Sequence, residues 1–442
     1  MKRIFFPGLL LFLLSLCAKA QPVYTLQQAI DTALAKNIAV RQSGLLSEEA
    51  AVYMKQARAN LLPDLGATFN HGINQGRSID PFTNAFVNQT VNFAGYGLSS
   101  GVVLFNGFTM QNTLKQTVYS YDASRMELQQ AKDNLTLNVI LAYLQVLNAE
   151  DMLSAAISQR EVSNKQLERL QVLDGQGAIS PSQVSDVKGQ LMNDELSILN
   201  LRNSLETAKL SLAQLMNVPY QRSLTLQRIN ADEFLTSYGL SAGDVYNTAL
   251  QQFSQIKSVE LRRRSAEYAL KAARGTLFPV VTLGGNMQTN YSSVAMDASG
   301  KIPYKDQISN NMFYTLNLGL RIPIFSNLRA RNNIKLADIQ VRNSELVEEN
   351  TRVHLRQQVE QAHLSMTNAY ERYKALLDQV AAYKTSFKAA EARLAAGVGT
   401  TVDYIIAKSN LDRADINLIN AKYDFVLRKK ILDYYQNVAP VR

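Results

Sequence analysis

Few residues of this chain combine the type and the spacing that catalysis or metal binding would need. The three histidines are His71, His354 and His363, and the last two are nine residues apart, which misses the i, i+4 relation of paired ligands on a helix. Gly95-Tyr96-Gly97 lies inside a strand-like stretch, so it does not open a dinucleotide-binding loop. No nucleophile motif, phosphate-binding loop or carboxylate pair stands out. The sequence therefore predicts no enzyme, no cofactor and no metal site.

Acidic and small residues cluster instead around two short turns. The first turn is Gly175-Gln176-Gly177-Ala178-Ile179-Ser180-Pro181, followed by Asp186, and the second is Gly397-Val398-Gly399-Thr400-Thr401, followed by Asp403. Glycine commonly ends a helix, while serine or threonine caps the next one and proline fits its first position. On these grounds Asp403 would stabilise a helix N-terminus, and Asp186 would lie on a solvated helix face.

Very long helical stretches must position these turns. Residues 108–174 and 326–396 contain no glycine or proline, and a helix through either run would be about 100 Å long. Residues 190–218 and 400–439 are also uninterrupted, and apolar residues recur at spacings of three and four, as in a coiled-coil seam. We therefore expect two helical hairpins, whose helices are 107–174 with 181–217, and 326–396 with 400–438.

A different pattern precedes each long helix. From Met312 to Ile324 alternate residues are apolar, and those between them are mostly polar or small. A period of two predicts a β-strand with one apolar and one polar face. Weaker versions of the same pattern occur in the first half of the chain. We predict strands near 64–75, 92–105, 280–291 and 312–325.

The chain carries this plan twice. Thr32-Ala33-Leu34 recurs as Thr248-Ala249-Leu250 at an offset of 216, and Asn217-Val218 recurs as Asn437-Val438 at an offset of 220. Each copy reads helix, strand, strand, long helix, helix, so the predicted fold is mainly α with a small β part. The predicted division is a signal peptide at 1–20, a first repeat at 21–220, a connecting segment at 221–240 and a second repeat at 241–442.

The N-terminus and the charge narrow the class of protein. Lys2 and Arg3 precede an apolar stretch and the site Ala18-Lys19-Ala20, which is typical of a cleaved secretory signal, with lipidation at Cys17 as the alternative. Cleavage removes three cations and no acid, so the net charge falls from +9 to +6. No run of Lys and Arg favours nucleic acid, and no later stretch is apolar enough for a membrane-spanning helix.

The predicted strands need partners that one chain does not supply. An isolated hairpin is marginal in water, and an open sheet edge is not tolerated in lipid. One interpretation is a small soluble sheet that caps a helical bundle. The other is a membrane barrel closed by association, in which two chains would give eight strands and three would give twelve with a lumen.

The architecture resembles the TolC family of outer-membrane efflux channel proteins over essentially the whole mature chain. Residues Arg321-Ile322-Pro323-Ile324-Phe325-Ser326-Asn327-Leu328-Arg329-Ala330-Arg331 are similar to the family's strand-to-helix junction, and Val103-Leu104-Phe105-Asn106-Gly107 is the first-half version. Residues Gly397-Val398-Gly399-Thr400-Thr401-Val402-Asp403-Tyr404 resemble the family's second helical tip. The junction residues singled out by this resemblance are Phe105, Gly107, Pro323 and Phe325.

The resemblance implies a homotrimer in the outer membrane. A twelve-stranded transmembrane β-barrel would continue into a long periplasmic α-helical barrel. Its tips would meet a periplasmic adaptor protein and an inner-membrane pump or ABC transporter, and the barrel would contact outer-membrane lipid. The expected function is a passive exit channel for efflux or type I secretion. A soluble periplasmic coiled-coil adaptor or scaffold is the alternative.

The resemblance also implies roles for the tip residues. The family's pore narrows at tips lined by polar and acidic side chains, which correspond here to Asp403, Thr400, Thr401 and Asp186. Docking of the adaptor corresponds to Gly177, Ala178, Ile179, Ser180, Gly397, Val398 and Gly399. The family's basic gate position is Gly399 in this chain and its second acid is Ile406, so these two positions depart from the family's pattern.

Overall fold

The computed structural model describes residues 23–79, 84–229 and 238–436. The predicted signal peptide at 1–20 lies outside the described residues, as do residues 230–237 of the connecting segment and residues 437 and 438 of the last predicted helix. The chain forms two compact units. We call them the hairpin unit (Met1–Gly44, Glu127–Ile256 and Thr351–Arg442) and the sheet unit (Leu45–Met126 and Lys257–Asn350). Each unit therefore combines segments of both sequence repeats.

The helices of the two halves match in length. Each half has helices of 11, 22, 67 and 35 residues, in that order. They are α2 (Leu26–Lys36), α3 (Ile38–Ala59), α4 (Thr109–Gly175) and α5 (Pro181–Leu215), then α6 (Ala242–Gln252), α7 (Ser254–Gly275), α9 (Arg329–Ala395) and α10 (Thr401–Tyr435). Their starting residues differ by 216 for the first two pairs and by 220 for the last two, which are the offsets of the sequence repeat. The predicted duplicated, mainly helical fold is confirmed.

The single helix expected at the start of each half is in fact two helices. Asn37 separates α2 from α3 with an extended backbone (φ −65°, ψ 126°). Its side-chain oxygen accepts hydrogen bonds from the amides of Ala39 and Val40 at 2.9 and 3.2 Å, so it caps the second helix. Phe253 separates α6 from α7 with a similar backbone (φ −70°, ψ 125°). A short side chain that caps a new helix competes with helix continuation, and the apolar pattern does not reveal this break.

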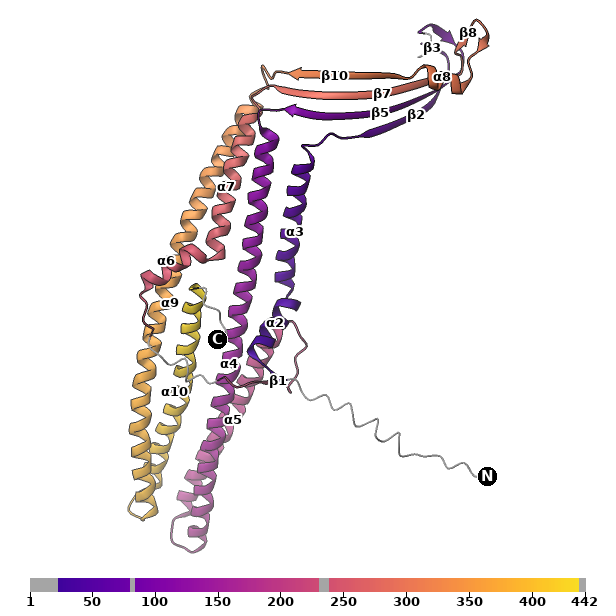
Figure 1. Cartoon of the computed structure of the whole chain (residues 1–442). Coiled ribbons are helices and arrows are strands. Elements are labelled where there is room, and N and C mark those ends of the chain that lie inside the picture. The colour runs from indigo at the N-terminus through magenta and orange to yellow at the C-terminus, as the bar shows by residue number, and fades with distance from the viewer. Residues whose placement is uncertain (1–22, 80–83, 230–237, 437–442) are drawn as a thin grey trace, which may run out of the picture. The chain divides into compact units, whose positions relative to one another are not determined.

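In the hairpin unit, α4 and α5 form one helical hairpin, and α9 and α10 form the other (Figure 1). Apolar side chains of α2, α4, α5 and α10 make one buried cluster, and those of α6, α7, α9 and α10 make a second. The fully buried Tyr143 hydrogen-bonds the carbonyls of Tyr24 and Gln227 at 3.0 and 2.7 Å. It thereby anchors the parallel pair of β1 (Val23–Tyr24) and β6 (Thr225–Leu226). None of the helices in the described part of the chain is long and apolar enough to cross a membrane.

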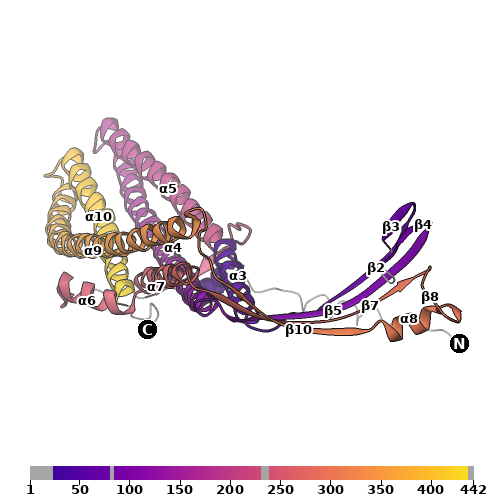
Figure 2. The ribbon, with the colours of Figure 1, turned by 90° about the horizontal axis from the view of Figure 1, so that it is seen from above.

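In the sheet unit, four antiparallel strands form one sheet in the order β10-β7-β5-β2 (Figure 1). They are β2 (Gly66–Asn74), β5 (Val91–Phe105), β7 (Val280–Ser292) and β10 (Phe313–Arg321). Met287 is paired with both Leu98 and Tyr314, so the apolar positions of neighbouring strands fall on one face. Figure 2 shows that the strands bend along their length. β2 and β10 are the edge strands of this sheet.

Short elements lie at the end of the sheet away from the helices. β3 (Arg77–Ile79) pairs with β4 (Phe86–Asn88), β8 (Met296–Asp297) pairs with β9 (Gly300–Lys301), and α8 covers Tyr304–Asn310. The buried side chain of Gln307 accepts a hydrogen bond from the Ser292 amide at 2.9 Å and donates to the Ser292 and Ile302 carbonyls at 3.0 and 2.8 Å. One buried amide therefore holds the loop between β7 and β10 in shape.

The strand predicted at 312–325 ends earlier, at Arg321. Pro323 has no amide hydrogen for a ladder bond, so the pairing cannot continue through it. The next helix begins at Arg329, three residues later than the predicted start at 326, because Asn327 and Leu328 both adopt left-handed backbone conformations (φ 50° and 59°). Gly107 and Phe108 do the same before α4 (φ 64° and 61°). Two consecutive left-handed residues therefore turn the chain from strand to helix in both halves.

Glycine is required where the start of α4, from the first half of the chain, crosses the end of α7, from the second half. A Cβ atom on Gly275, the last residue of α7, would lie 2.5 Å from the carbonyl oxygen of Gly107, closer than real side chains come. Gly107 is equally crowded and also has a positive φ. Beside them, the Thr109 hydroxyl donates a hydrogen bond to the Ala272 carbonyl at 3.3 Å. The start of α4 is thereby held against the end of α7 with no space for a side chain between them.

Candidate functional site

Two tight turns form the tips of the helical hairpins. Gly177 and Gly397 take the left-handed conformation there, with φ of 69° and 71°. The amide of Ala178 donates to the Leu173 carbonyl at 2.9 Å, and that of Val398 donates to the Arg393 carbonyl at 3.1 Å. This six-to-one bonding is the glycine C-cap that the sequence indicated. The two tips are therefore built in the same way.

Thr400 caps α10 and is joined to Asp403. The Thr400 hydroxyl accepts a hydrogen bond from the Asp403 amide at 3.0 Å and donates one to the Asp403 carboxylate at 2.7 Å. A carboxylate in the first helical turn is also favoured by the helix dipole. The structure therefore places Asp403 in the first turn of the helix that Thr400 caps. Both side chains are exposed to solvent.

The other predicted tip residues differ in exposure. Thr401 is 2% exposed, and its hydroxyl has no hydrogen-bond partner among the described residues. Asp186 is exposed on α5, and none of the described ion pairs involves it. Ile179 and Gly399 are half-buried. The remaining predicted docking residues are exposed at the two turns: Gly177, Ala178, Ser180, Gly397 and Val398.

Exposed apolar side chains extend from the second tip along α10. Val398, Val402 and Ile406 are 78%, 55% and 54% exposed. Val402 and Ile406 are four residues apart and so share one face of the helix. Contiguous exposed apolar residues commonly mark a surface that contacts another protein. This face is therefore a candidate contact surface at the tip.

A buried ionic cluster lies a few residues beyond the second tip, and the sequence analysis did not predict it. The Lys408 ammonium of α10 is 3.1 Å from the Asp194 carboxylate of α5 and also contacts Asp412 one turn further along α10. Lys408 and Asp194 are 1% and 8% exposed. The Ser163 hydroxyl of α4 donates to Asp194, and Gln190 donates to its other oxygen at 2.8 Å. The cluster links the two helical hairpins through charged groups held out of water.

The burial of this cluster changes the pKa of one of its acidic side chains. Desolvation raises the pKa of Asp412, and the nearby Lys408 cation opposes that rise. An ion pair in such a place depends on every partner, because removing one leaves a buried charge uncompensated. Two features of the sequence could have revealed it. Tyr404, Lys408 and Asp412 are four residues apart on one helix face, and Lys408 is the repeat partner of Lys188.

The sheet presents one apolar and one polar face. On β10 the side chains of Tyr314, Leu316, Leu318 and Leu320 are between 64% and 79% exposed, and on β2 Phe69 is 74% exposed. So many exposed large apolar side chains exceed what a water-facing surface normally carries. The opposite face carries mostly Asn, Gln, Thr, Ser and Gly, with Arg321 at its edge, and the four strands contain no Asp, Glu or Lys.

The predicted junction residues form a rim at the helix end of this sheet. Ile324 and Phe325 are 95% and 77% exposed, and Pro323 beside them is also exposed. In the first half, Phe105 packs edge-on against Phe108 with ring centroids 5.5 Å apart. The apolar face of the sheet therefore continues to the start of α9.

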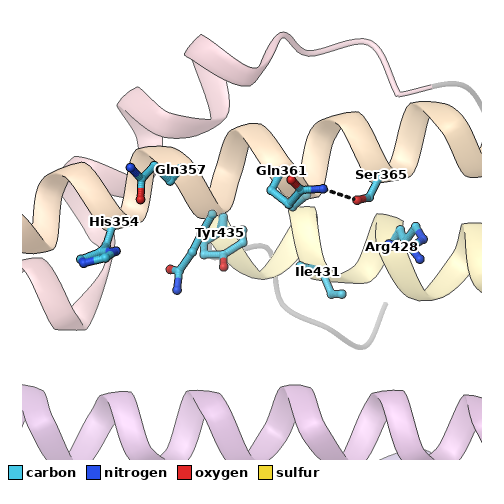
Figure 3. A pocket seen from close by; sticks show the side chains of 9 residues that line it. His354, Gln357, Gln361, Ser365, Arg428, Ile431 and Tyr435 are labelled. Carbon is cyan, nitrogen blue, oxygen red and sulfur yellow. Dashed lines mark hydrogen bonds between the residues drawn. The ribbon is translucent and has the colours of Figure 1, made fainter.

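A polar groove of about 460 Å³ lies between α9 and α10 in the hairpin unit (Figure 3). Within it, Gln361 donates to the Ser365 hydroxyl at 3.1 Å, and Arg428 is already paired with Asp424 at 2.9 Å. His354 is the only imidazole among its lining residues. Across residues 23–79, 84–229 and 238–436, no three His, Cys, Asp or Glu side chains are grouped to hold a metal ion. The groove offers amides and hydroxyls rather than reactive groups.

The family profile and the similar proteins match both halves of the chain. The family profile described as Outer membrane efflux protein matches residues 29–218 and 245–432. Outer membrane protein TolC of Escherichia coli strain K12 is 23% identical over 424 residues, which cover 91% of this chain and 80% of TolC. The solved structure of CusC has a TM-score of 0.81 at 18% identity, covering 94% of this chain and 92% of CusC. That of VceC from Vibrio cholerae has a TM-score of 0.78 at 16% identity, covering 93% and 94%.

The two matched segments make up most of the chain. They run from α2 to beyond α5 and from α6 into α10, so they contain both tips and both strand pairs. The solved structures share the fold from end to end. This chain therefore belongs to the outer membrane efflux protein family, with the fold and the outer-membrane location of the TolC channels.

Proposed function

We propose that this protein is the exit channel of a tripartite efflux system or a type I secretion system. It works as a passive homotrimeric conduit from the periplasm to the exterior, and it docks a periplasmic adaptor that is bound to an inner-membrane pump or ABC transporter. The observation that carries the proposal is the sheet, which combines an exposed apolar face with two unpaired edges. A soluble adaptor or scaffold has no use for such a face.

Closure of the sheet requires other copies of the chain. Among the described residues, β2 and β10 each leave one row of backbone amides and carbonyls without a strand partner. Each such group costs several kcal/mol in hydrocarbon, so an open edge is excluded there. Pairing β10 of one copy with β2 of the next removes both edges. Three copies give twelve strands with an open lumen lined by the polar face, whereas eight strands would be filled by side chains.

Electron microscopy of the detergent-purified protein, averaged with and without imposed three-fold symmetry, tests this assembly. We expect a hollow three-fold particle with a detergent belt at one end and a tube of about 100 Å, the length of a 67-residue helix. A monomeric or dimeric rod without a belt would contradict the channel and favour the soluble scaffold.

The exposed tips are the surface that we assign to the adaptor. Gly177 and Gly397 carry no side chain and face open space, so a partner can approach the backbone closely. The apolar residues Val398, Val402 and Ile406 next to the second tip supply area that a partner can bury. A bulky side chain in the turn would prevent the partner from approaching the backbone, and it would not enter the buried core.

We therefore predict that Gly397→Trp abolishes export in cells while leaving trimers intact. The control is Gly397→Asn, because asparagine tolerates a positive φ at small cost and adds little bulk. Export is measured as efflux or secretion in cells that supply the cognate adaptor and pump. Full export by the Trp variant, or equal loss in both variants, would remove the docking assignment.

The constriction is assigned to the acidic and hydroxyl side chains at the tips. In a trimer, Asp403 and Thr400 would form an exposed ring, with Asp186 as a second source of carboxylates and the buried Thr401 supporting the turn. A ring of three carboxylates favours cations. In other family members the gate includes a second acid and a basic residue, and these two positions are Ile406 and Gly399 in this chain. We assign the role of that gate to the carboxylate ring.

Replacement Asp403→Asn should lower the cation-to-anion permeability ratio in planar bilayers by about twofold or more. This follows because one charge about 8 Å from an ion in water contributes about 0.5 kcal/mol. Asparagine keeps an oxygen that can accept the Thr400 hydrogen bond, so the turn should survive. The matched control is Asp378→Asn, an exposed acid on α9. An unchanged ratio for Asp403→Asn would leave Asp403 with its capping role alone.

The buried Lys408 cluster is assigned as the link that holds the α9–α10 hairpin to the α4–α5 hairpin. A tip that opens must separate α10 from α5, and that movement would break the contact between Lys408 and Asp194. The strength of this link would then set how easily the tips part.

Loss of the Lys408 cation in Lys408→Met should lower the free energy of local opening in α5 and α10 by about 3–5 kcal/mol, since the Asp194 and Asp412 carboxylates lose the cation that compensates their charge. Amide hydrogen exchange measures this opening. Lys188→Met, at the exposed repeat position, is the control and should change nothing. Adding Asp194→Asn and Asp412→Asn should restore part of the protection. A Lys408→Met protein that exchanges like the wild type would show that the ion pair does not hold the hairpins together.

A further inference from the structure

Exposed cations gather at the helix end of the sheet, in the sheet unit. We call this set the basic collar: Arg58 at the end of α3, Arg274 at the end of α7, and Arg329, Arg331 and Lys335 at the start of α9. None of the described ion pairs or side-chain hydrogen bonds involves any of the five. Nearby acids are engaged elsewhere: Asp64 accepts from the Gly101 amide at 2.6 Å, and Asp338 pairs with Arg342 at 2.9 Å.

Helix dipoles explain the positions of some cations of the basic collar but not of the others. Arg58 and Arg274 lie in the last turns of their helices, where the helix dipole favours a cation. Arg329 and Arg331 lie in the first turn of α9, where the dipole opposes a cation, and no acid accompanies them there. Two arginines placed against the dipole, with no side-chain partner in the described part of the chain, indicate an anion outside the chain.

The position of the collar identifies that anion. Arg329 is preceded by Leu328, which is 53% exposed. In the other half, Arg58 precedes Leu62, which is 67% exposed. Exposed apolar side chains therefore lie directly beside the cations. A ligand that fits both has acyl chains next to an anionic phosphate, and guanidinium groups bind phosphate oxygens well.

We propose that the basic collar binds the headgroups of anionic glycerophospholipids in the membrane leaflet on the helix side. The assignment rests on the proposed function, because it needs the sheet in a bilayer and the helices outside it. Long basic side chains beside the membrane extend to the headgroups while their stems cover apolar surface. The collar then fixes the depth of the sheet in the membrane and gives the channel a preference for anionic over zwitterionic lipid.

The test uses the full-length trimer in nanodiscs of phosphatidylglycerol and phosphatidylcholine. The protein is re-extracted in mild detergent, and its bound lipids are quantified by mass spectrometry. The collar variant is Arg329→Gln, Arg331→Gln and Lys335→Gln together. The matched control removes the same charges from exposed positions further along α9, as Arg356→Gln, Arg372→Gln and Lys388→Gln.

We expect the wild type and the control to retain phosphatidylglycerol above its share in the bilayer, and the collar variant to lose that enrichment by about tenfold or more. Excess inorganic phosphate should not displace the lipid, whereas displacement would reveal a phosphate site without lipid recognition. A trimer that inserts but shows no enrichment, or a collar variant that behaves like the control, overturns the collar alone. A protein that does not insert as a trimer overturns the proposed function and the collar together.

Discussion

The unpaired edges of the four-stranded sheet are the constraint on which the rest of this structure depends. One face of the sheet is apolar and exposed, which suits lipid, yet lipid offers no partner for the backbone groups of β2 and β10. Only strands of other copies can supply those partners without burying the apolar face. The assembly, the position of the apolar rim and the location of a lumen on the polar face all follow from that requirement.

The two sequence repeats contribute neighbouring strands to one sheet, so part of the strand pairing is made within a single chain. β5 of the first half pairs with β7 of the second, so both strand-to-helix junctions must lie at the same end of one sheet. Gly107 and Gly275 make this possible, because the crossing leaves no space for a Cβ atom. The offset changes from 216 to 220 between α7 and α9, so the four additional residues fall in the strand region and leave the helix lengths equal. Insertion is tolerated in a loop but not in a paired helix.

Much of this fold could be predicted from the sequence, because its signals are long and repeated. Runs without glycine or proline gave the four long helices, and alternation gave all four main strands. The predicted ends of helices and strands were wrong where one or two residues set the local backbone conformation. Asn37 splits a helix by capping the next one, Pro323 ends a strand early, and the left-handed pair Asn327 and Leu328 delays α9. In the candidate site, the turns and the Thr400–Asp403 cap followed from residue types. The Lys408 cluster did not, because its partners come from three helices that only the tertiary fold brings together.

The distribution of charge separates the tasks of the two units. The four main strands carry no Asp, Glu or Lys, and the polar residues of the face assigned to the lumen are Asn, Gln, Thr and Ser apart from Arg321 at its edge. Such a lining gives water and cargo hydrogen-bonding groups without sorting them by charge. An exposed acidic group is found instead at the second tip, as Asp403, and the basic collar lies at the helix end of the sheet. In the proposed channel, discrimination by charge would therefore occur at the tips, and the strands would provide a neutral exit.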